Sequence, residues 1–167
     1  KQNSINNKKI KEFIDKEKYT YIEEKGEQEN TINALYKNQI SENRVTEISE
    51  DIVNKYKDIN SNPMQKLKDV VKEFYEKKLK GEKVNVKVKD GYISVKFEND
   101  GKKKSVGWRM KADKAATFEY LKDIVSGADY AFSEINRDTN ESMDVPQFHD
   151  FVSTVKIGDS LIPVVTQ

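Results

Sequence analysis

The sequence predicts an α+β fold in which a helical N-terminal part precedes an antiparallel β-sheet with one packed helix. Apolar residues recur at helical spacing through much of residues 5–80, which is typical of amphipathic helices. Residues 84–97 alternate apolar and polar side chains around Asp90-Gly91, which predicts a hairpin. Residues 112–165 show a helical pattern followed by strand patterns. We therefore predict a helical N-terminal region over residues 1–82 and a domain of sheet plus helix over residues 83–167.

Three helices are expected before residue 57. Residues 5–24 and 28–39 each carry one narrow apolar stripe among charged residues. Ser41 is a suitable N-cap for a third helix, in which Val45, Ile48, Ile52 and Tyr56 repeat at intervals of three and four. Isolated helices of this length are marginal in water. We therefore expect these stripes to pack on the C-terminal region or on another chain.

A fourth helix is expected from Asn62-Pro63, as N-cap and first helical residue, to Gly81. Its predicted apolar face is formed by Met64, Leu67, Val71, Phe74 and Tyr75. Six lysines lie among the other positions. They indicate either a solvated outer face or a surface that follows phosphates.

The hairpin at residues 84–97 is expected to have a type I′ turn at Asp90-Gly91 and to continue into a third strand over residues 102–109. One face of this antiparallel sheet is apolar and the other is rich in lysine. Its lysines either attract a polyanion or protect the sheet edge from pairing with other chains. They are Lys87, Lys89, Lys96, Lys102, Lys103 and Lys104.

The C-terminal part is expected to begin with a helix over residues 112–127 that ends at Gly127. A short extended piece follows over residues 128–133, and residues 136–146 form a polar loop. Residues 147–157 and 161–165 are predicted strands joined by a Gly158-Asp159 turn. Pro163 cannot donate a backbone hydrogen bond, so it indicates an edge strand.

Charge is distributed unevenly along the chain. The net charge is only +1, but residues 83–111 carry nine basic and three acidic groups, whereas residues 112–167 carry four and ten. This predicts a polarised molecule. The absence of cysteine excludes disulfides and thiolate chemistry. Since no apolar run approaches the ~18 residues that a membrane-spanning helix needs, no membrane partner is expected.

His149 is the one side chain of a type that titrates near neutral pH. Strand alternation places it on the same face as Phe151, Ser153 and Val155, where it has either a packing role or a catalytic role. A metal site is not expected, because the sequence has one histidine and its aspartates show no ligand spacing. No cofactor motif is present either.

Candidate phosphate-binding and base-stacking residues lie around the predicted helix 112–127. Arg109 and Lys111 stand at the strand-to-helix junction, and Arg137 lies in the polar loop. Arginine binds phosphate through two parallel hydrogen bonds, although pairing with a nearby carboxylate is the alternative role. Aromatic side chains can stack on bases or lie in the core. They are Tyr92, Trp108, Tyr130 and Phe148.

The order of elements and two motifs carry a family resemblance. Basic strands lead into KADKAATFEYLKDIVSGADYAFSEIN, which holds Ala128, Tyr130 and Ser133 in an A-x-Y-x-x-S piece. The strand FHDFVSTVKIG follows, and its matching residues are His149, Phe151, Ile157 and Gly158. Residues 84–167 thereby resemble the nuclease domains grouped with barnase, EndoU and RelE-type toxins. They resemble especially the versions found in MuF-type phage head proteins and large polyvalent toxin proteins.

The resemblance implies helices on one face of an antiparallel sheet, a cleft on the other face, and metal-independent RNA cleavage. It implies His149 as general acid or base and Arg109, Lys111 and Arg137 as phosphate clamps. Glu134 and Thr154 are candidates for a second proton-transfer or orienting role. The nucleic-acid-binding candidates are Lys87, Lys96, Lys103, Lys104, Lys111, Trp108 and Tyr130. The acidic balance of residues 112–167 opposes strong RNA attraction there.

Two functions follow as hypotheses. The first is a ribonuclease-like toxin domain of a phage or mobile-element protein, acting on RNA in the bacterial cytoplasm after delivery or in association with a virion. The second is a non-catalytic protein-interaction module, such as a phage-encoded inhibitor of a host defence protein, or a domain that meets an immunity protein. The long charged helical half and the acidic C-terminal segment favour the second hypothesis.

Overall fold

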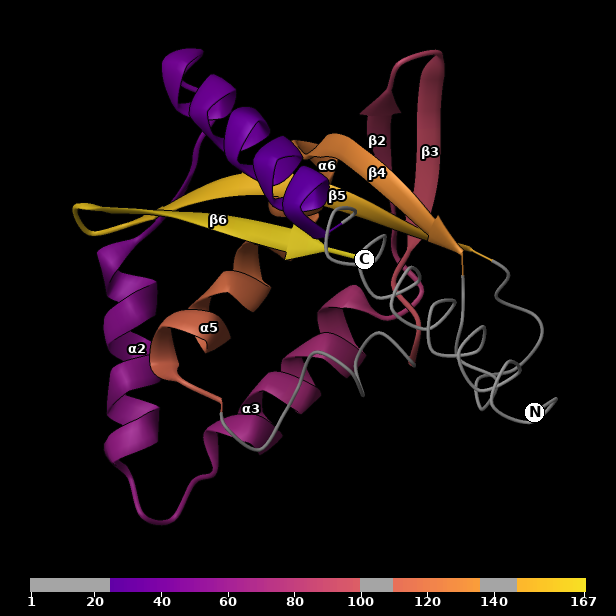
Figure 1. Cartoon of the computed structure of the whole chain (residues 1–167). Helices are drawn as coiled ribbons and strands as arrows, with labels where there is room; N and C mark the ends of the chain where they lie inside the picture. Colours follow the sequence, from indigo (N-terminus) through magenta and orange to yellow (C-terminus); the bar gives the residue numbers. More distant parts are fainter. Residues whose placement is uncertain (1–24, 100–109, 136–146) are drawn as a thin grey trace, which may run out of the picture. The chain divides into compact units, whose positions relative to one another are not determined.

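The computed structural model describes residues 25–99, 110–135 and 147–167 (Figure 1). The predicted helix over residues 5–24, the predicted strand over 102–109 and the polar loop over 136–146 lie outside these ranges. The chain divides into two units, residues 1–34 and 35–167. Residues 25–41 are helical, so the helix predicted over residues 28–39 is confirmed. The predicted domain boundary between residues 82 and 83 stays a prediction.

A four-stranded sheet is built around its longest strand, β5 (Gln147–Ile157). β6 (Ser160–Thr166) pairs with residues 151–157 of β5 in antiparallel register. β4 (Asp129–Ile135) pairs antiparallel with residues 147–152, and β1 (Thr46–Ile48) pairs parallel with residues 155–157. Because β6 occupies one edge of β5, β4 and β1 must share the other edge end to end.

The helices and a separate hairpin complete the second unit (Figure 1). They are α2 (Glu50–Ser61), α3 (Leu67–Phe74), the π-helical turn η1 (Tyr75–Leu79), α5 (Ala112–Thr117), the 3₁₀ turn η2 (Phe118–Tyr120) and α6 (Leu121–Ser126). The hairpin consists of β2 (Lys83–Val88) and β3 (Gly91–Lys96), and β2 contacts α6 and β4. The predicted α+β class is therefore confirmed.

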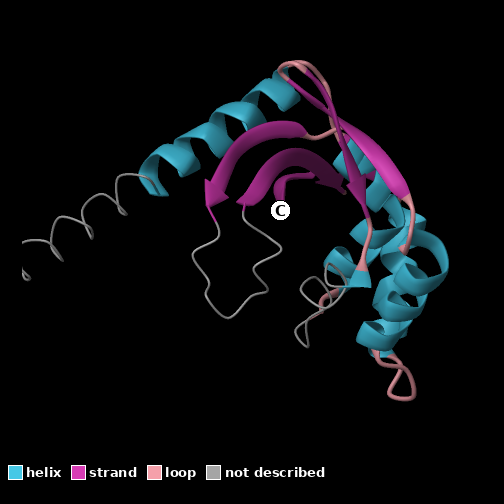
Figure 2. Cartoon of the chain, turned by 90° about the vertical axis from the view of Figure 1, so that its right-hand side faces the viewer, coloured by secondary structure: helices cyan, strands magenta, loops and turns pink. Residues whose placement is uncertain are grey.

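Helices cover both faces of the sheet within residues 35–167 (Figure 2). On one face Phe151 and Val155 join the main core, and Ser153 Oγ donates a hydrogen bond to the Ile124 carbonyl of α6 (2.6 Å). On the other face Val152 and Thr154 are also buried, and Thr154 bonds to Gln39. The prediction of a cleft on the second face is therefore wrong for this part of the sheet, because residues 35–41 cover that face.

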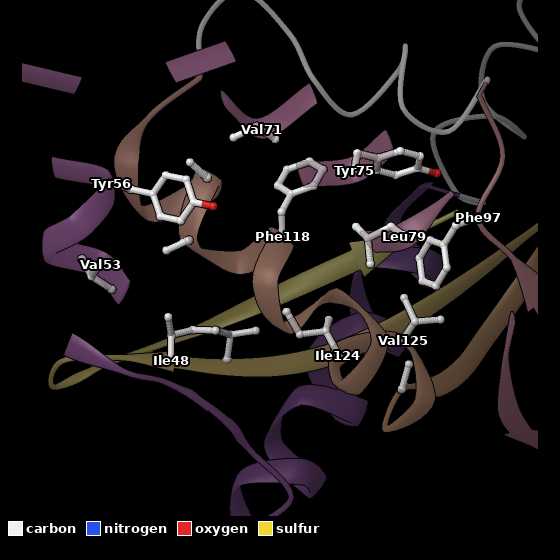
Figure 3. Close-up of a cluster of buried hydrophobic side chains, with 14 of the residues drawn as sticks. Ile48, Val53, Tyr56, Val71, Tyr75, Leu79, Phe97, Phe118, Ile124 and Val125 are labelled. Carbon is white, nitrogen blue, oxygen red and sulfur yellow. The ribbon is translucent and has the colours of Figure 1, made fainter. Parts of the chain in front are cut away.

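The main core gathers side chains from nearly every element of the unit (Figure 3). Tyr56, Val71, Phe118 and Ile124 are each at most 3% exposed. Burying an apolar side chain of this size contributes about 1.5–3 kcal/mol. The predicted apolar face of the fourth helix is largely confirmed, since Leu67, Val71 and Tyr75 are buried. In the predicted helix over residues 112–127, Ala115, Phe118, Ile124 and Val125 are buried. Met64 is an exception at 90% exposed.

Two predicted helix starts are wrong. Thr46–Ile48 forms β1 rather than a turn of helix, because these residues pair with β5, and helix α2 begins only at Glu50. Asn62 follows α2 as its C-cap, and its Oδ1 accepts a hydrogen bond from the Met64 backbone N–H (2.9 Å). That local turn delays α3 to Leu67.

The hairpin is confirmed, but its turn lies one residue earlier than expected. Val88 pairs with Gly91, so Lys89 and Asp90 form the turn. A type I′ turn needs positive φ at both turn residues. Among the described residues that are not glycine, Asn43 alone has a positive φ, and Gly91 itself takes φ 138°. The predicted type I′ turn is therefore wrong, and the positive φ belongs to Gly91, the first residue of β3.

The side-chain amide of Gln39 joins the helix over residues 35–41 to the sheet. Gln39 is 0% exposed, and its Nε2 donates to the Val152 carbonyl (2.7 Å) and to Asp129 Oδ2 (3.0 Å). Thr154 Oγ1 donates to Gln39 Oε1 (2.7 Å). Asp129 also accepts two hydrogen bonds from the Arg44 guanidinium (3.0 and 2.9 Å). Both the nitrogen and the oxygen of the Gln39 amide are therefore hydrogen-bonded. They contact β5 between the end of its pairing with β4 and the start of its pairing with β1.

A second polar contact holds α2 against η2. The Tyr56 hydroxyl donates to Glu119 Oε1 (2.9 Å), and Lys55 Nζ pairs with the same oxygen (2.5 Å). The backbone N–H of Ser49 donates to the Tyr120 hydroxyl (3.0 Å). Burial, together with the Glu119 carboxylate, raises the pKa of Tyr56 above its ordinary value. Within the described ranges, no helix is long and apolar enough to cross a membrane.

We predict that Gln39→Ala lowers the free energy of unfolding by about 2–4 kcal/mol, because it leaves buried polar groups of Val152 and Thr154 without partners. Urea unfolding measures this loss, with Lys37→Ala on the same helix as the exposed control. A double-mutant cycle with Thr154→Val should show coupling between the two side chains. A Gln39→Ala loss below about 0.5 kcal/mol would refute the anchoring role, since that is the range of neutral surface changes.

We predict that stability falls as the pH rises above about 10, the pKa of an unperturbed tyrosine. Folding raises the pKa of Tyr56, so the folded state holds this proton more tightly and its stabilisation disappears at alkaline pH. One such group contributes a slope of at most about 1.4 kcal/mol per pH unit. Urea unfolding between pH 8.5 and 11 should show a shallower slope for Tyr56→Phe.

Tyr75 keeps part of the slope in that variant, because burial raises its pKa as well. The largely exposed Tyr92 provides the control variant Tyr92→Phe. Equal slopes for the wild type and Tyr56→Phe would contradict the linkage.

Candidate functional site

His149 lies on β5 directly opposite Ser133 of β4. Its ring is 5.9 Å from the Tyr130 ring, centroid to centroid, and Tyr130 packs edge-on against Phe151 at 5.7 Å. The His149 ring is partly buried, and its buried Nδ1 has no hydrogen-bond partner among the described residues. An unsatisfied buried polar atom costs about 1–3 kcal/mol. This atom therefore needs an explanation beyond packing.

Residues directly opposite each other in an antiparallel pair project from the same face. His149, Ser133, Tyr130 and Phe151 therefore share one face of the β4–β5 pair. This confirms that His149 shares the face of Phe151, which joins the main core. The structure thus brings His149 together with Tyr130 and Ser133, which belong to the same A-x-Y-x-x-S piece.

Glu134 and Thr154 project from the opposite face. Glu134 pairs with Phe148 across the strands, and Thr154 is an odd number of residues from His149 on β5. Thr154 is 2% exposed and its hydroxyl donates to Gln39 Oε1. The structure therefore does not bring either residue to the face of His149.

Four candidate phosphate-binding residues and one candidate stacking residue lie outside the described residues. They are Arg109, Arg137, Lys103, Lys104 and Trp108. Lys111 is exposed immediately before α5, and its carbonyl accepts the hydrogen bond of Ala115 N–H (2.9 Å). Lys87 and Lys96 are exposed on the hairpin. Where the structure is described, no three His, Asp or Glu side chains are grouped so that they could hold a metal ion.

Strand β6 carries a feature that the sequence prediction did not use. Leu161, Ile162 and Val165 are 38%, 39% and 47% exposed on a strand that, within the described part, pairs only with β5. The signal is the run LIPVV, in which positions of both parities are apolar although Pro163 marks an edge strand. Exposed apolar side chains on a sheet edge are typical of contact surfaces.

These features define an α+β domain with a mixed sheet, a histidine beside a tyrosine on one sheet face, and a lysine-bearing hairpin. A family model, described as large polyvalent protein-associated domain 3, matches residues 62–166, from just before α3 to the end of β6. The match covers more than half of the chain, and the chain belongs to this family. No curated protein and no solved structure matches the chain.

Family membership confirms the polyvalent-protein context that the sequence resemblance implied. It is consistent with a phage or mobile-element protein. The match spans the hairpin, the α5–α6 helices and the sheet strands β4 to β6, so it includes His149, Tyr130 and the exposed apolar residues of β6.

Proposed function

We propose that the chain is a metal-independent ribonuclease-like toxin domain of a phage or mobile-element protein. The single observation that carries the proposal is the environment of His149. A side chain of the type used for general acid–base chemistry stands beside Tyr130, and in the described part of the chain its Nδ1 has no partner. The resemblance to barnase-, EndoU- and RelE-type domains and the polyvalent-protein family support the same function.

In this proposal the reaction needs no metal. A base removes the proton of a ribose 2′-hydroxyl, whose oxygen attacks the adjacent phosphorus. The bond from phosphorus to the 5′-oxygen breaks, and an acid protonates that oxygen, leaving a 2′,3′-cyclic phosphate. His149 exchanges one of these protons. Arg109, Arg137 and Lys111 neutralise the phosphate, while Glu134 and Thr154, which project from the other sheet face, have at most a supporting role.

The test is cleavage of a fluorescent RNA in the presence of a metal chelator between pH 5 and 9. We expect cleavage by the wild type and a loss of about 10²–10⁴-fold for His149→Ala, because general acid–base catalysis contributes that much. Melting temperatures should be nearly equal. Asp159→Asn, at the exposed β5–β6 turn, is the matched control. Intact RNA over the whole pH range would end the ribonuclease proposal.

A second candidate function is a non-catalytic protein-interaction module, and the exposed apolar residues of β6 favour it. Exposed apolar side chains on an edge strand can pack against the surface of a partner, although the Leu161 carbonyl of this edge already accepts a hydrogen bond from the Tyr36 hydroxyl (3.0 Å). The partner class is a host defence protein or an immunity protein, as the sequence hypothesis states. Leu161, Ile162 and Val165 would supply the apolar contact.

We predict that a partner complex, if this second function holds, is lost with Ile162→Lys and retained with His149→Ala. A charge on an exposed apolar side chain of the contact costs binding energy, whereas His149 pairs with β4 and lies outside the stretch of β5 that pairs with β6. Size-exclusion chromatography of the purified pair measures this difference. Retention of the complex by Ile162→Lys, or its loss with His149→Ala, would contradict docking on β6.

A further inference from the structure

The β2–β3 hairpin has one apolar and one polar face, and its register assigns each residue to a face. Val84 pairs with Val95 and Val86 with Ile93, and this face joins the main core, with Val86 0% exposed. The opposite face is solvent-exposed. It consists of Lys83, Asn85 and Lys87 from β2 and Tyr92, Ser94 and Lys96 from β3, with Lys89 in the turn. We call this set the outer hairpin face.

We propose that the outer hairpin face binds single-stranded RNA, with Tyr92 stacking on a base and the lysines neutralising phosphates. This deepens the proposed ribonuclease function by naming the form of its substrate. It rests on that function only for its biological setting, since binding is measured separately from cleavage.

Three of the four lysines of this face have no ion pair with any described residue. Lys83 stands directly opposite Lys96, and like charges in that position destabilise a hairpin. Lys96 is relieved by an ion pair with Glu98 (2.5 Å). Lys83, Lys87 and Lys89 make no ion pair or hydrogen bond to any described residue. An anionic partner would supply the missing charge.

Tyr92 separates RNA binding from simple protection of a sheet edge. Lysines alone would explain why this hairpin resists pairing with other chains. A tyrosine that is 71% exposed adds apolar surface, which works against that purpose. Tyr92 lies directly opposite Lys87, so its ring and the ammonium group project side by side. An aromatic ring beside a cation matches a nucleotide, which has a base to stack and a phosphate to neutralise.

The spacing of the charges favours a polymer over a single anion. Lys83 and Lys87 are four residues apart on one strand, which corresponds to about 13 Å at 3.3 Å per residue. The lysines therefore form a track rather than a pocket around one phosphate. Stacking on Tyr92 requires an unstacked base, and a duplex hides its base faces. These two points together select a single strand.

The experiment is fluorescence anisotropy of a labelled 12-nucleotide single-stranded RNA with the full chain, in the His149→Ala background so that the RNA stays intact. We expect Tyr92→Ala to weaken binding about 5- to 150-fold, the equivalent of one lost base stack. Lys87→Ala should lower the slope of log K against log salt by about 0.7, the value for one single-strand phosphate contact. Lys57→Ala, an exposed lysine of α2, should change neither.

Three results would overturn the proposal. They are Tyr92→Ala binding within twofold of the parent, equal affinity for a double-stranded RNA of the same length, and equal affinity for an acidic polyglutamate peptide. The last result would identify an acidic protein surface as the partner instead. RNA binding without cleavage by the wild-type chain would overturn the ribonuclease function alone, whereas cleavage without these binding effects would overturn the outer hairpin face alone.

Discussion

The sheet depends on one buried amide, because β5 lacks a continuous neighbour on one edge. β4 ends its pairing at Val152 and β1 begins at Val155, so the backbone and hydroxyl groups between them need partners from elsewhere. Gln39 supplies them with three hydrogen bonds, to Val152, Thr154 and Asp129. A leucine of similar volume would bury more apolar area but would leave these groups unsatisfied, at about 1–3 kcal/mol each. The polar residue is therefore the stabilising choice at this position.

This anchoring determines which surfaces are left for function. Residues 35–41 cover one face of β5 and the helical core covers the other, so the middle of the strand offers no open face. The accessible candidate surfaces lie at the margins of the sheet and on the separate hairpin. His149 lies near the start of β5 beside Tyr130, the β6 edge exposes three apolar side chains, and the hairpin turns its lysines outward. Each candidate function therefore uses one of these three surfaces, which differ in the chemical type of their exposed side chains.

Local periodicity predicted those elements in which the apolar positions of the sequence are also the buried positions of the structure. The bounds of β5, the presence of the hairpin and the helical stretch near residues 112–127 follow from alternation or helical spacing, and so does the shared face of His149 and Phe151. The helical prediction for Ile48 was wrong, because the apolar residues of a strand followed by a helix can fall at helical spacing, here as far as Tyr56. Gln39 could not be predicted, since its partners Val152 and Thr154 are 113 and 115 residues away. For the same reason the sequence could not show that Thr154 bonds to a helix, although strand alternation already places Thr154 on the face opposite His149.

The match to the family model begins at residue 62, although the structure needs earlier residues. Asp129, Val152 and Thr154 lie inside the matched segment, but Gln39, Arg44 and the whole of β1 precede it. The same holds for the core, where Ile48, Val53 and Tyr56 pack with Phe118 and Ile124. A chain starting at residue 62 would therefore expose apolar surface and leave buried acceptors without donors. The residues proposed to contact RNA or a partner lie within the family segment, whereas many of the residues that hold them in place come before it.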